Sequence, residues 1–521
     1  MKTAVILAVS IVSVATAAHA GELSDTQTQS EQLREQNKLL TKRIEQLEKR
    51  QRKLEAQSAS HPGLAAQPET QPVFAARPAK PTDTMAEDYK KAPPFPADDG
   101  SLTYRGITLY GTIDMGLGYQ THGTPLNGSA GFGLEYLISK NSNHPYFGLA
   151  PNALSASNVG LKGVEEVYPG LSVVFNLQTS FVPTSGKLAD GLASIVQNNG
   201  VPLASQTSNA DSSKAGQVFN TAAYAGLSSP TYGTLTFGRQ NALTLDGVLA
   251  YDPMGGSGAF SLIGFQGATA GMGDTENARL DSSLKYRVNL GPFRAAAAGQ
   301  VAPSGDGTRN VVEGQLGVDY LGASFDAIYS HVNDAISAAP FAVGVTPTLA
   351  QFENVGAGLV AGTVSDNTSL MLLARYAIGP VKLYAGYENI QFANPNTPLV
   401  AGSTIIGGYT LGTVNNTAFT NNKDLQVFWT GAKYAVSSEI DLSAAYYHEE
   451  QNSFQGNGCT NNTFAACSGQ LDAVSFLADY RFTKRFDVYA GIMFSHVANG
   501  LSNGFLNTST IDPTVGLRFQ F

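Results

Sequence analysis

The feature that most constrains the fold of this chain is a series of short segments, from residue 101 onward, in which apolar and polar side chains alternate. In one of them, Leu280, Leu284, Tyr286 and Val288 fall on one face, and charged or hydroxyl side chains occupy the other. Successive side chains of a β-strand point to opposite faces, so this period of two predicts strands with one apolar surface. Sixteen such runs follow one another, at about 103–119, 155–166, 170–182, 218–228, 232–240, 279–289, 292–301, 311–320, 323–331, 366–378, 380–391, 423–434, 438–448, 470–481, 485–497 and 510–521.

The connections between these runs alternate in length. Short turns such as 167–169 and 229–231 alternate with long polar segments such as 183–217 and 241–278. A soluble sandwich also shows alternating strands, but short turns at one rim and long loops at the other are typical of an outer-membrane barrel. We therefore predict an all-β fold for residues 101–521, a transmembrane antiparallel barrel of about sixteen strands.

Composition and the last strand support this prediction. Charged residues make up only 14% of the chain, whereas soluble proteins average about 25%. Beyond residue 20 no run approaches the roughly 20 apolar residues of a membrane-spanning helix. The last run keeps Val515, Leu517, Phe519 and Phe521 on one face, and we expect Phe521 to act as the C-terminal signal read by the barrel-assembly machinery.

Three segments precede the barrel. Residues 1–20 read as a signal peptide, with Lys2 before an apolar stretch and an A-x-A cleavage site at 18–20. Residues 21–60 are predicted to be a periplasmic coiled coil, because four leucines recur every seven residues: Leu33, Leu40, Leu47 and Leu54. Residues 61–100 hold eight of the 24 prolines and are predicted to be an extended linker.

Several stretches resemble the general Gram-negative porins, especially the trimeric sixteen-stranded kind. They are Leu109-Tyr-Gly-Thr-Ile-Asp114, Ser157-Asn-Val-Gly-Leu-Lys-Gly-Val-Glu165, Ala225-Gly-Leu-Ser-Ser229, Gly233-Thr-Leu-Thr-Phe-Gly-Arg-Gln240 and Tyr251-Asp-Pro253. A coiled coil ahead of the barrel is similar to the arrangement in the sucrose-specific porins. The resemblance implies a homotrimer in the outer membrane, in contact with its lipid, with a third loop folded into the pore.

The resemblance also implies a pore constriction, where acids on the third loop face basic residues on the wall. This chain has fewer charged residues on both the wall and the loop. Asn158 and Thr112 stand where family members carry basic residues, and the loop stretch 258–266 holds no acid. The constriction residues it implies are Arg239, Arg279, Lys285, Lys162, Asn158, Thr112, Asp252, Phe260 and Phe265. We expect a mild field with a weak anion preference, and the apolar loop residues either line the pore or pack the loop against the wall. Strict alternation would place Arg239 outward beside Phe237 unless the strand bulges there.

Other chemistry finds little support in the sequence. The histidines form no H-E-x-x-H pair, and the nearest approach to G-x-S-x-G breaks at Ala259. We therefore expect no enzyme, no metal site and no cofactor. The net charge of −9 argues against a nucleic-acid partner. Cys459 and Cys467 are expected to form a disulfide within a loop, with two free thiols as the alternative.

These observations predict a Gram-negative outer-membrane channel for passive diffusion of small hydrophilic solutes and ions. Two alternatives stay open. One is a substrate-selective, sugar-type porin. The other is a structural protein whose coiled coil links the barrel to peptidoglycan.

Overall fold

The computed structural model describes residues 102–124, 133–207, 217–263, 278–300, 311–344, 358–405, 409–455 and 464–521, together with Lys38, Lys42 and Lys49. These three lysines are helical and exposed. The rest of the predicted signal peptide, coiled coil and linker lies outside the described residues.

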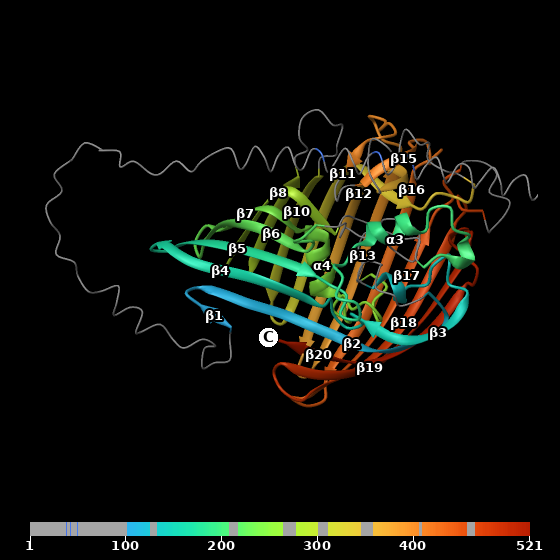
Figure 1. Ribbon diagram of the computed structural model, residues 1–521. Helices are drawn as coiled ribbons and strands as arrows, with labels where there is room; N and C mark the ends of the chain where they lie inside the picture. The colour runs from blue at the N-terminus through green and yellow to red at the C-terminus, as the bar shows by residue number, and fades with distance from the viewer. Residues whose placement is uncertain are drawn as a thin grey trace, which may run out of the picture. The chain divides into compact units, whose positions relative to one another are not determined.

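Sixteen antiparallel strands form a closed barrel (Figure 1). They are β2 (Ile107–Gly123), β4 (Asn158–Tyr168), β5 (Leu171–Ser180), β6 (Ala222–Ser229), β7 (Gly233–Asn241), β8 (Arg279–Leu290), β9 (Phe293–Gln300), β10 (Val311–Tyr320), β11 (Ala323–Ala339), β12 (Leu359–Ile378), β13 (Val381–Ala393), β16 (Lys423–Ala435), β17 (Ile440–Gln451), β18 (Gly469–Arg481), β19 (Phe486–Asn499) and β20 (Ser509–Gln520). All sixteen predicted runs are confirmed as strands. The strands β11 and β12 extend well into the stretch predicted as a loop.

The barrel closes where β20 pairs with β2. Met115 lies opposite Leu517 in this register, and Gly116 lies opposite Gly516. The amide N of Gly111 lies 3.0 Å from the carbonyl O of Phe521, and the reciprocal hydrogen bond measures 3.1 Å. Any Cβ at position 116 would stand 2.1 Å from the carbonyl O of Val515, so the close approach of the two strands requires glycine there.

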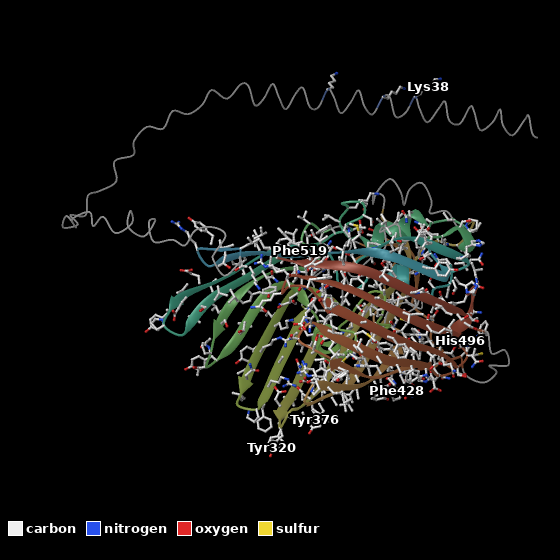
Figure 2. All side chains as sticks on the ribbon, turned by 90° about the horizontal axis from the view of Figure 1, so that it is seen from below. Lys38, Tyr320, Tyr376, Phe428, His496 and Phe519 are labelled. Carbon is white, nitrogen blue, oxygen red and sulfur yellow. The ribbon has the colours of Figure 1, made fainter. Side chains whose placement is uncertain are left out.

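The two faces of the wall largely follow the predicted alternation. The placement of Leu280 with Leu284 and Tyr286 was wrong: Leu280 is buried and the other two are exposed, because the register of β7 and β8 shifts between them. On β20, Val515, Leu517 and Phe519 are exposed on the outer face, whereas Thr514 points inward and is buried. Exposed aromatic side chains also mark the short-turn rim, including Tyr320 and Tyr376 near the ends of β10 and β12 (Figure 2). Such aromatic bands sit at the membrane–water interface of outer-membrane barrels.

The long connections contain further ordered elements. Strand β3 (His144–Pro151) pairs with the second half of β2, and β4 pairs with the first half. The two strands therefore occupy one position in the barrel wall and are separated by a bend. The others are β1 (Thr103–Tyr104), β14 (Thr404–Ile405), β15 (Tyr409–Asn415), α3 (Gly191–Gln197), α4 (Leu243–Tyr251), η1 (Leu134–Tyr136), η2 (Leu203–Ser205) and η4 (Gly500–Ser502). Within the described ranges, no helix has the length and hydropathy needed to cross a membrane.

Asp114 stabilises the bend between β3 and β4. Its Oδ2 atom accepts hydrogen bonds from the amides of Leu154 at 3.0 Å and Ser155 at 2.6 Å. Its Oδ1 atom accepts a 2.5 Å hydrogen bond from the hydroxyl of Tyr489 on β19. A buried carboxylate thus satisfies backbone donors that the broken strand leaves without ladder partners.

Candidate functional site

The connection between β7 and β8 packs against side chains that point inward from other strands. At its start, the amide of Leu243 donates a 2.7 Å hydrogen bond to Glu313 of β10. At the end of α4, the indole of Trp429 on β16 donates to the carbonyl of Tyr251 at 3.1 Å. The hydroxyl of Tyr447 on β17 donates to Asp252 at 2.7 Å. Residues 242–263, hereafter the 242–263 segment, are therefore held by several strands other than their own neighbours.

The far end of this segment is fixed by apolar packing. Phe260 is fully buried, and its ring meets the ring of Tyr489 edge-on with 6.1 Å between centroids. A Cβ at Gly491 on β19 would come within 2.5 Å of the Phe260 ring, so the glycine makes room for it. Leu262 and Ile263 are also buried. Packing against the wall is thus the role observed for these side chains, and Phe265 lies outside the described residues.

The opposite side of α4 faces a polar hollow of about 370 Å³. We call this space the polar hollow; its walls come from the inner face of β5–β8 and from α4. The residues with polar side chains include Asn176, Gln178, Tyr224, Asp246, Lys285 and Arg287. Inside the barrel, the 242–263 segment thus packs against the wall on one side, and α4 borders the polar hollow on the other.

One carboxylate and two cations meet in the polar hollow. Asp246 Oδ2 lies 2.9 Å from Lys285 Nζ and also pairs with Arg287. Its Oδ1 atom accepts a 3.0 Å hydrogen bond from Asn241. Burial alone would raise the pKa of Asp246. The opposite effect of the positive charges of Lys285 and Arg287 is larger, so the net shift of this pKa is downward. The trio carries a net charge of +1.

A second hollow of about 650 Å³ continues toward the short-turn rim. It shares Thr234 and Arg287 with the polar hollow, and its lining includes Ser172, Asn289 and Arg294. We call it the turn-side hollow. Its lining also holds apolar residues such as Val174 and Pro230. The two hollows adjoin along the inner wall, with Arg287 in the lining of both, and we call them together the polar passage, after the charged and hydrogen-bonding groups of the first.

The predicted wall arginines occupy the upper end of this wall. The register of β7 shifts between Gly238 and Gln240, and Gly238 has a φ of +125°. The extra residue lies on β8, so that Asp281 and Ser282 face Arg239 across the pair. Arg239 is buried, its Nη1 atom lies 2.6 Å from Asp281, and Phe237 is exposed outside. Arg279 begins β8 opposite Asn241. The sequence left the side of Arg239 open, outward by strict alternation unless the strand is irregular there, and the register irregularity against β8 falls at this residue.

The remaining predicted wall residues lie on β2 and β4. Lys162 is exposed, with Nζ 5.0 Å from the centroid of the Tyr110 ring, and it lies opposite Asn176 in the register. Asn158 donates a 2.7 Å hydrogen bond to the carbonyl of Ala156. Thr112 is buried and lies beside Asn158 in the sheet. Of the predicted cations, Lys285 lines the polar hollow, and Lys162 and Arg279 lie opposite two residues of its lining, Asn176 and Asn241.

Asp252 occupies a different environment from the pore-facing one expected. It is buried, and its carboxylate accepts hydrogen bonds from Tyr447 and from the amides of Met254 and Gly256. Burial raises the pKa of Asp252, against the lowering effect of these hydrogen bonds. This carboxyl group anchors the segment instead of facing the passage.

Sequence reasoning missed two residues of the passage. Arg287 lies two positions after Lys285 on the same face of β8, so the alternation that placed Lys285 inward would also have placed Arg287 there. Asp246 is not among the predicted residues, because nothing in the local pattern predicts that α4 turns it toward Lys285.

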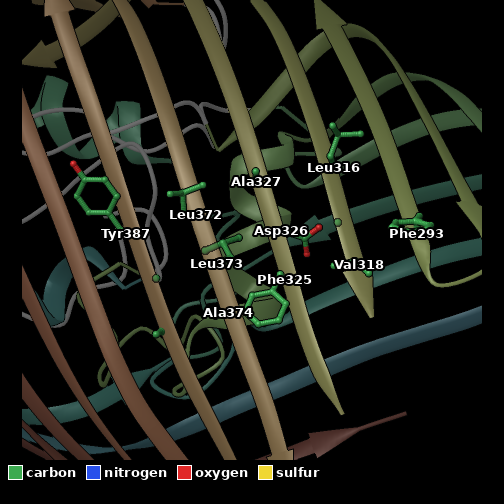
Figure 3. Close-up of a pocket in the computed structure, with 13 residues that line it drawn as sticks. Phe293, Leu316, Val318, Phe325, Asp326, Ala327, Leu372, Leu373, Ala374 and Tyr387 are labelled. Atoms are coloured by element: carbon green, nitrogen blue, oxygen red, sulfur yellow. The ribbon is translucent and has the colours of Figure 1, made fainter. Parts of the chain in front are cut away.

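A third hollow, of about 610 Å³, opens on the outside of the barrel (Figure 3). Its rim is formed by exposed apolar side chains, including Phe293, Leu316, Phe325 and Leu372, which point away from the interior. Because this hollow is apolar and faces the surface that meets lipid, it is separate from the polar passage.

One of the two cysteines lies among the described residues. Cys467 is buried and disulfide-bonded; Cys459 lies outside the described residues. Across the described ranges, no group of three or more His, Cys, Asp or Glu side chains is arranged to hold a metal ion.

The model of the Gram-negative porin family matches residues 84–500, which include nearly all of the barrel. The chain belongs to the Gram-negative porin family. As a member of this family it is an outer-membrane protein. This porin is also similar to an outer membrane porin protein of Bordetella pertussis, with 29% identity over 184 residues, 35% of this chain and 39% of that relative. The match thus spans well under half of the relative's length.

Solved structures with a similar shape include OmpT, an outer membrane protein of Vibrio cholerae, with a TM-score of 0.49 and 15% identity over 81% of this chain and 99% of that one. The outer membrane channel DcaP of Acinetobacter baumannii gives a TM-score of 0.45 and 11% identity over 82% of this chain and all of that one. OmpF of Salmonella typhi, in complex with daunomycin, gives a TM-score of 0.44 and 14% identity over 80% of this chain and 97% of that one.

Proposed function

We propose that this porin forms a water-filled channel for passive diffusion of small hydrophilic solutes and ions across the outer membrane. The observation that carries this proposal is the polar passage formed by the two hollows, which share Thr234 and Arg287 along the inner wall. Polar linings inside an apolar outer band are the arrangement by which such barrels conduct water-soluble solutes.

The 242–263 segment acts in this proposal as the inward-folded third loop. Its apolar side packs against the wall through Phe260 and its anchors Tyr447 and Trp429. Its other side narrows the passage at Asp246. The constriction would therefore select solutes by size, because the packed side leaves the segment little freedom to move.

The charges of the passage support a weak preference for anions. Lys162, Lys285 and Arg287 line or adjoin it, whereas Asp246 is the acid of the polar hollow. Arg239 and Asp281 neutralise each other above. Rings of charged side chains set the ion selectivity of such pores, so the reversal potential in a KCl gradient should carry the sign of anion selectivity. Strong cation selectivity would contradict this assignment.

The partners proposed here are two further copies of the chain, the outer-membrane lipid and the barrel-assembly machinery. No catalytic role is proposed for any residue. For the N-terminal segments we propose a periplasmic coiled coil that secures the trimer or contacts peptidoglycan. Deleting residues 21–100 separates the two roles: a tether would lose attachment to the envelope with conductance intact, whereas a trimer clamp would lose the three-step pattern of conductance.

Planar-bilayer recording of the purified full-length protein tests the proposal. A channel should appear as discrete conductance steps, grouped in threes for a trimer. A folded protein that inserts without conducting would refute the channel.

A further inference from the structure

The polar hollow contains one cation whose side chain is partly exposed. Lys285 is buried, and its Nζ atom donates to Asp246 at 2.9 Å and to the carbonyl O of Asn241 at 2.8 Å. Arg287 also pairs with Asp246, but 42% of its side chain is exposed. A guanidinium carries five donors in a planar fork, so Arg287 can bind a second carboxylate while it keeps its contact with Asp246.

The rest of the lining consists mainly of neutral hydrogen-bonding groups. Asn176 accepts a hydrogen bond from the hydroxyl of Tyr110 through Oδ1. This contact fixes the orientation of the side-chain amide, and with it the direction of the NH₂ group. Thr236 and Gln240 bond to each other at 2.6 Å. Gln178 and Tyr224 line the hollow on the same wall, beside Asn176. Amide and hydroxyl groups of this kind donate to and accept from solute hydroxyls.

Together these groups favour one class of solute. A neutral sugar would use the amides and hydroxyls. It would bring no second anion to Arg287, whose contact with Asp246 uses only part of the guanidinium. A simple anion such as acetate would use Arg287 alone. A solute with one carboxylate and several hydroxyls matches both parts, and about 370 Å³ is within the range of small-molecule sites.

We propose that the polar hollow is a binding site for small hydroxy-carboxylates of the sugar-acid class. The carboxylate pairs with Arg287, and the hydroxyls bond to Gln178, Tyr224 and Asn176. Lys162, which lies opposite Asn176 in the sheet, adds a second positive charge beside the site. This inference rests on the proposed channel function, because the solute has to reach the hollow through the passage.

The test is block of single-channel current by sodium gluconate, with glucose and sodium acetate as matched probes at constant ionic strength. We expect gluconate to block at concentrations at least about tenfold below those of glucose or acetate. Charge-assisted hydrogen bonds are strong enough to give a factor of this size. Equal block by glucose would show that the charge is unused, and equal block by acetate would show that the hydroxyls are unused; either result overturns the proposal.

Variants locate the effect. Arg287→Gln should raise the blocking concentration of gluconate at least about tenfold, whereas Lys484→Gln, in the turn before β19, removes a charge elsewhere and should leave it unchanged. If Arg287→Gln does not fold, Tyr224→Phe should weaken the block by gluconate without changing that by acetate. Conductance without selective gluconate block would refute this site but leave the channel standing, whereas absence of conductance would refute the channel itself.

Discussion

The hydroxyl of Tyr447 on β17 donates a 2.7 Å hydrogen bond to Asp252, just after α4, and both side chains are buried. This bond ties the connection between β7 and β8 to a strand far from it in the chain. The same carboxylate accepts the amide of Gly256 at 2.7 Å. Asp252 therefore couples the local turn of the segment to the barrel wall.

Replacing Tyr447 with Phe should loosen the 242–263 segment. The change leaves a buried carboxylate short of one donor, which costs about 1–3 kcal/mol. We expect a lower thermal midpoint and noisier open-channel current. Tyr446→Phe is the matched control, because its hydroxyl also bonds to a carboxylate, Asp472, at 2.7 Å but on the outer face. Equal noise in the two variants would contradict the anchoring role.

Truncating Phe260 should have a larger effect on the same segment. The ring is fully buried against Tyr489, and removal of a buried Phe side chain costs about 3–5 kcal/mol. We expect Phe260→Ala to make proteases cleave the 242–263 segment faster while the barrel stays folded. Phe519→Ala, on the outer face, is the comparison. Unchanged proteolysis of the Phe260 variant would show that the ring does not hold the segment.

Asp246→Asn should strengthen the anion preference at neutral pH. The carboxylate neutralises part of the charge of Lys285 and Arg287, so its loss raises the net charge of this trio from +1 to +2. The reversal potential in a KCl gradient measures the change. A shift toward cation selectivity would contradict the placement of Asp246 in the passage.

The pH dependence of wild-type selectivity follows from the same carboxylate. Because the folded-state pKa of Asp246 is lowered, its ion pairs contribute stability above its ordinary pKa of about 3.9, and this contribution is lost as the pH falls through the lowered pKa. Asp246 is ionised at both pH 5 and pH 7, so it should contribute equally to the ion selectivity at the two pH values. At pH values below the lowered pKa the wild type should approach the Asp246→Asn variant. An Asp246-dependent change between pH 7 and pH 5 would contradict the pairing.

The C-terminal aromatic should matter for assembly. Phe521 closes the seam through two backbone hydrogen bonds to Gly111, and its ring stacks on Phe519 with 6.1 Å between centroids. Deleting Phe521 removes both backbone bonds and should reduce the yield of heat-modifiable barrel in the outer membrane. Phe521→Tyr keeps the backbone and the ring and should assemble normally. Equal yields of the deletion and the wild type would contradict this role.

The wall of the barrel was readable from sequence because strand alternation is a local property. Leu284 and Tyr286 reveal their strand through their spacing alone, and the observed strand begins and ends within a residue of the predicted run. The burial of Leu280 could not be predicted, since it depends on one extra residue in β8, at the register shift between Ser283 and Leu280. Strict alternation fails wherever such an insertion shifts the register.

The interior was less predictable, because its contacts join residues far apart in the chain. The sequence offered two roles for Phe260, and only its contact with Tyr489, more than two hundred positions away, distinguishes them. Asp252 and Asp246 are six residues apart and look alike in sequence. One is buried against Tyr447 and the other pairs with Lys285, so tertiary packing alone decides which acid meets the passage.

The most direct test of the central claim is the conductance of the purified full-length protein in a planar bilayer before and after Arg287→Trp. The claim is that solutes pass along the β5–β8 wall, with Arg287 at the junction of the two hollows. We predict discrete steps for the wild type and markedly smaller steps for the variant, because the indole fills the junction. Wild-type protein that folds and inserts without conducting, or a variant with unchanged conductance, would contradict the account.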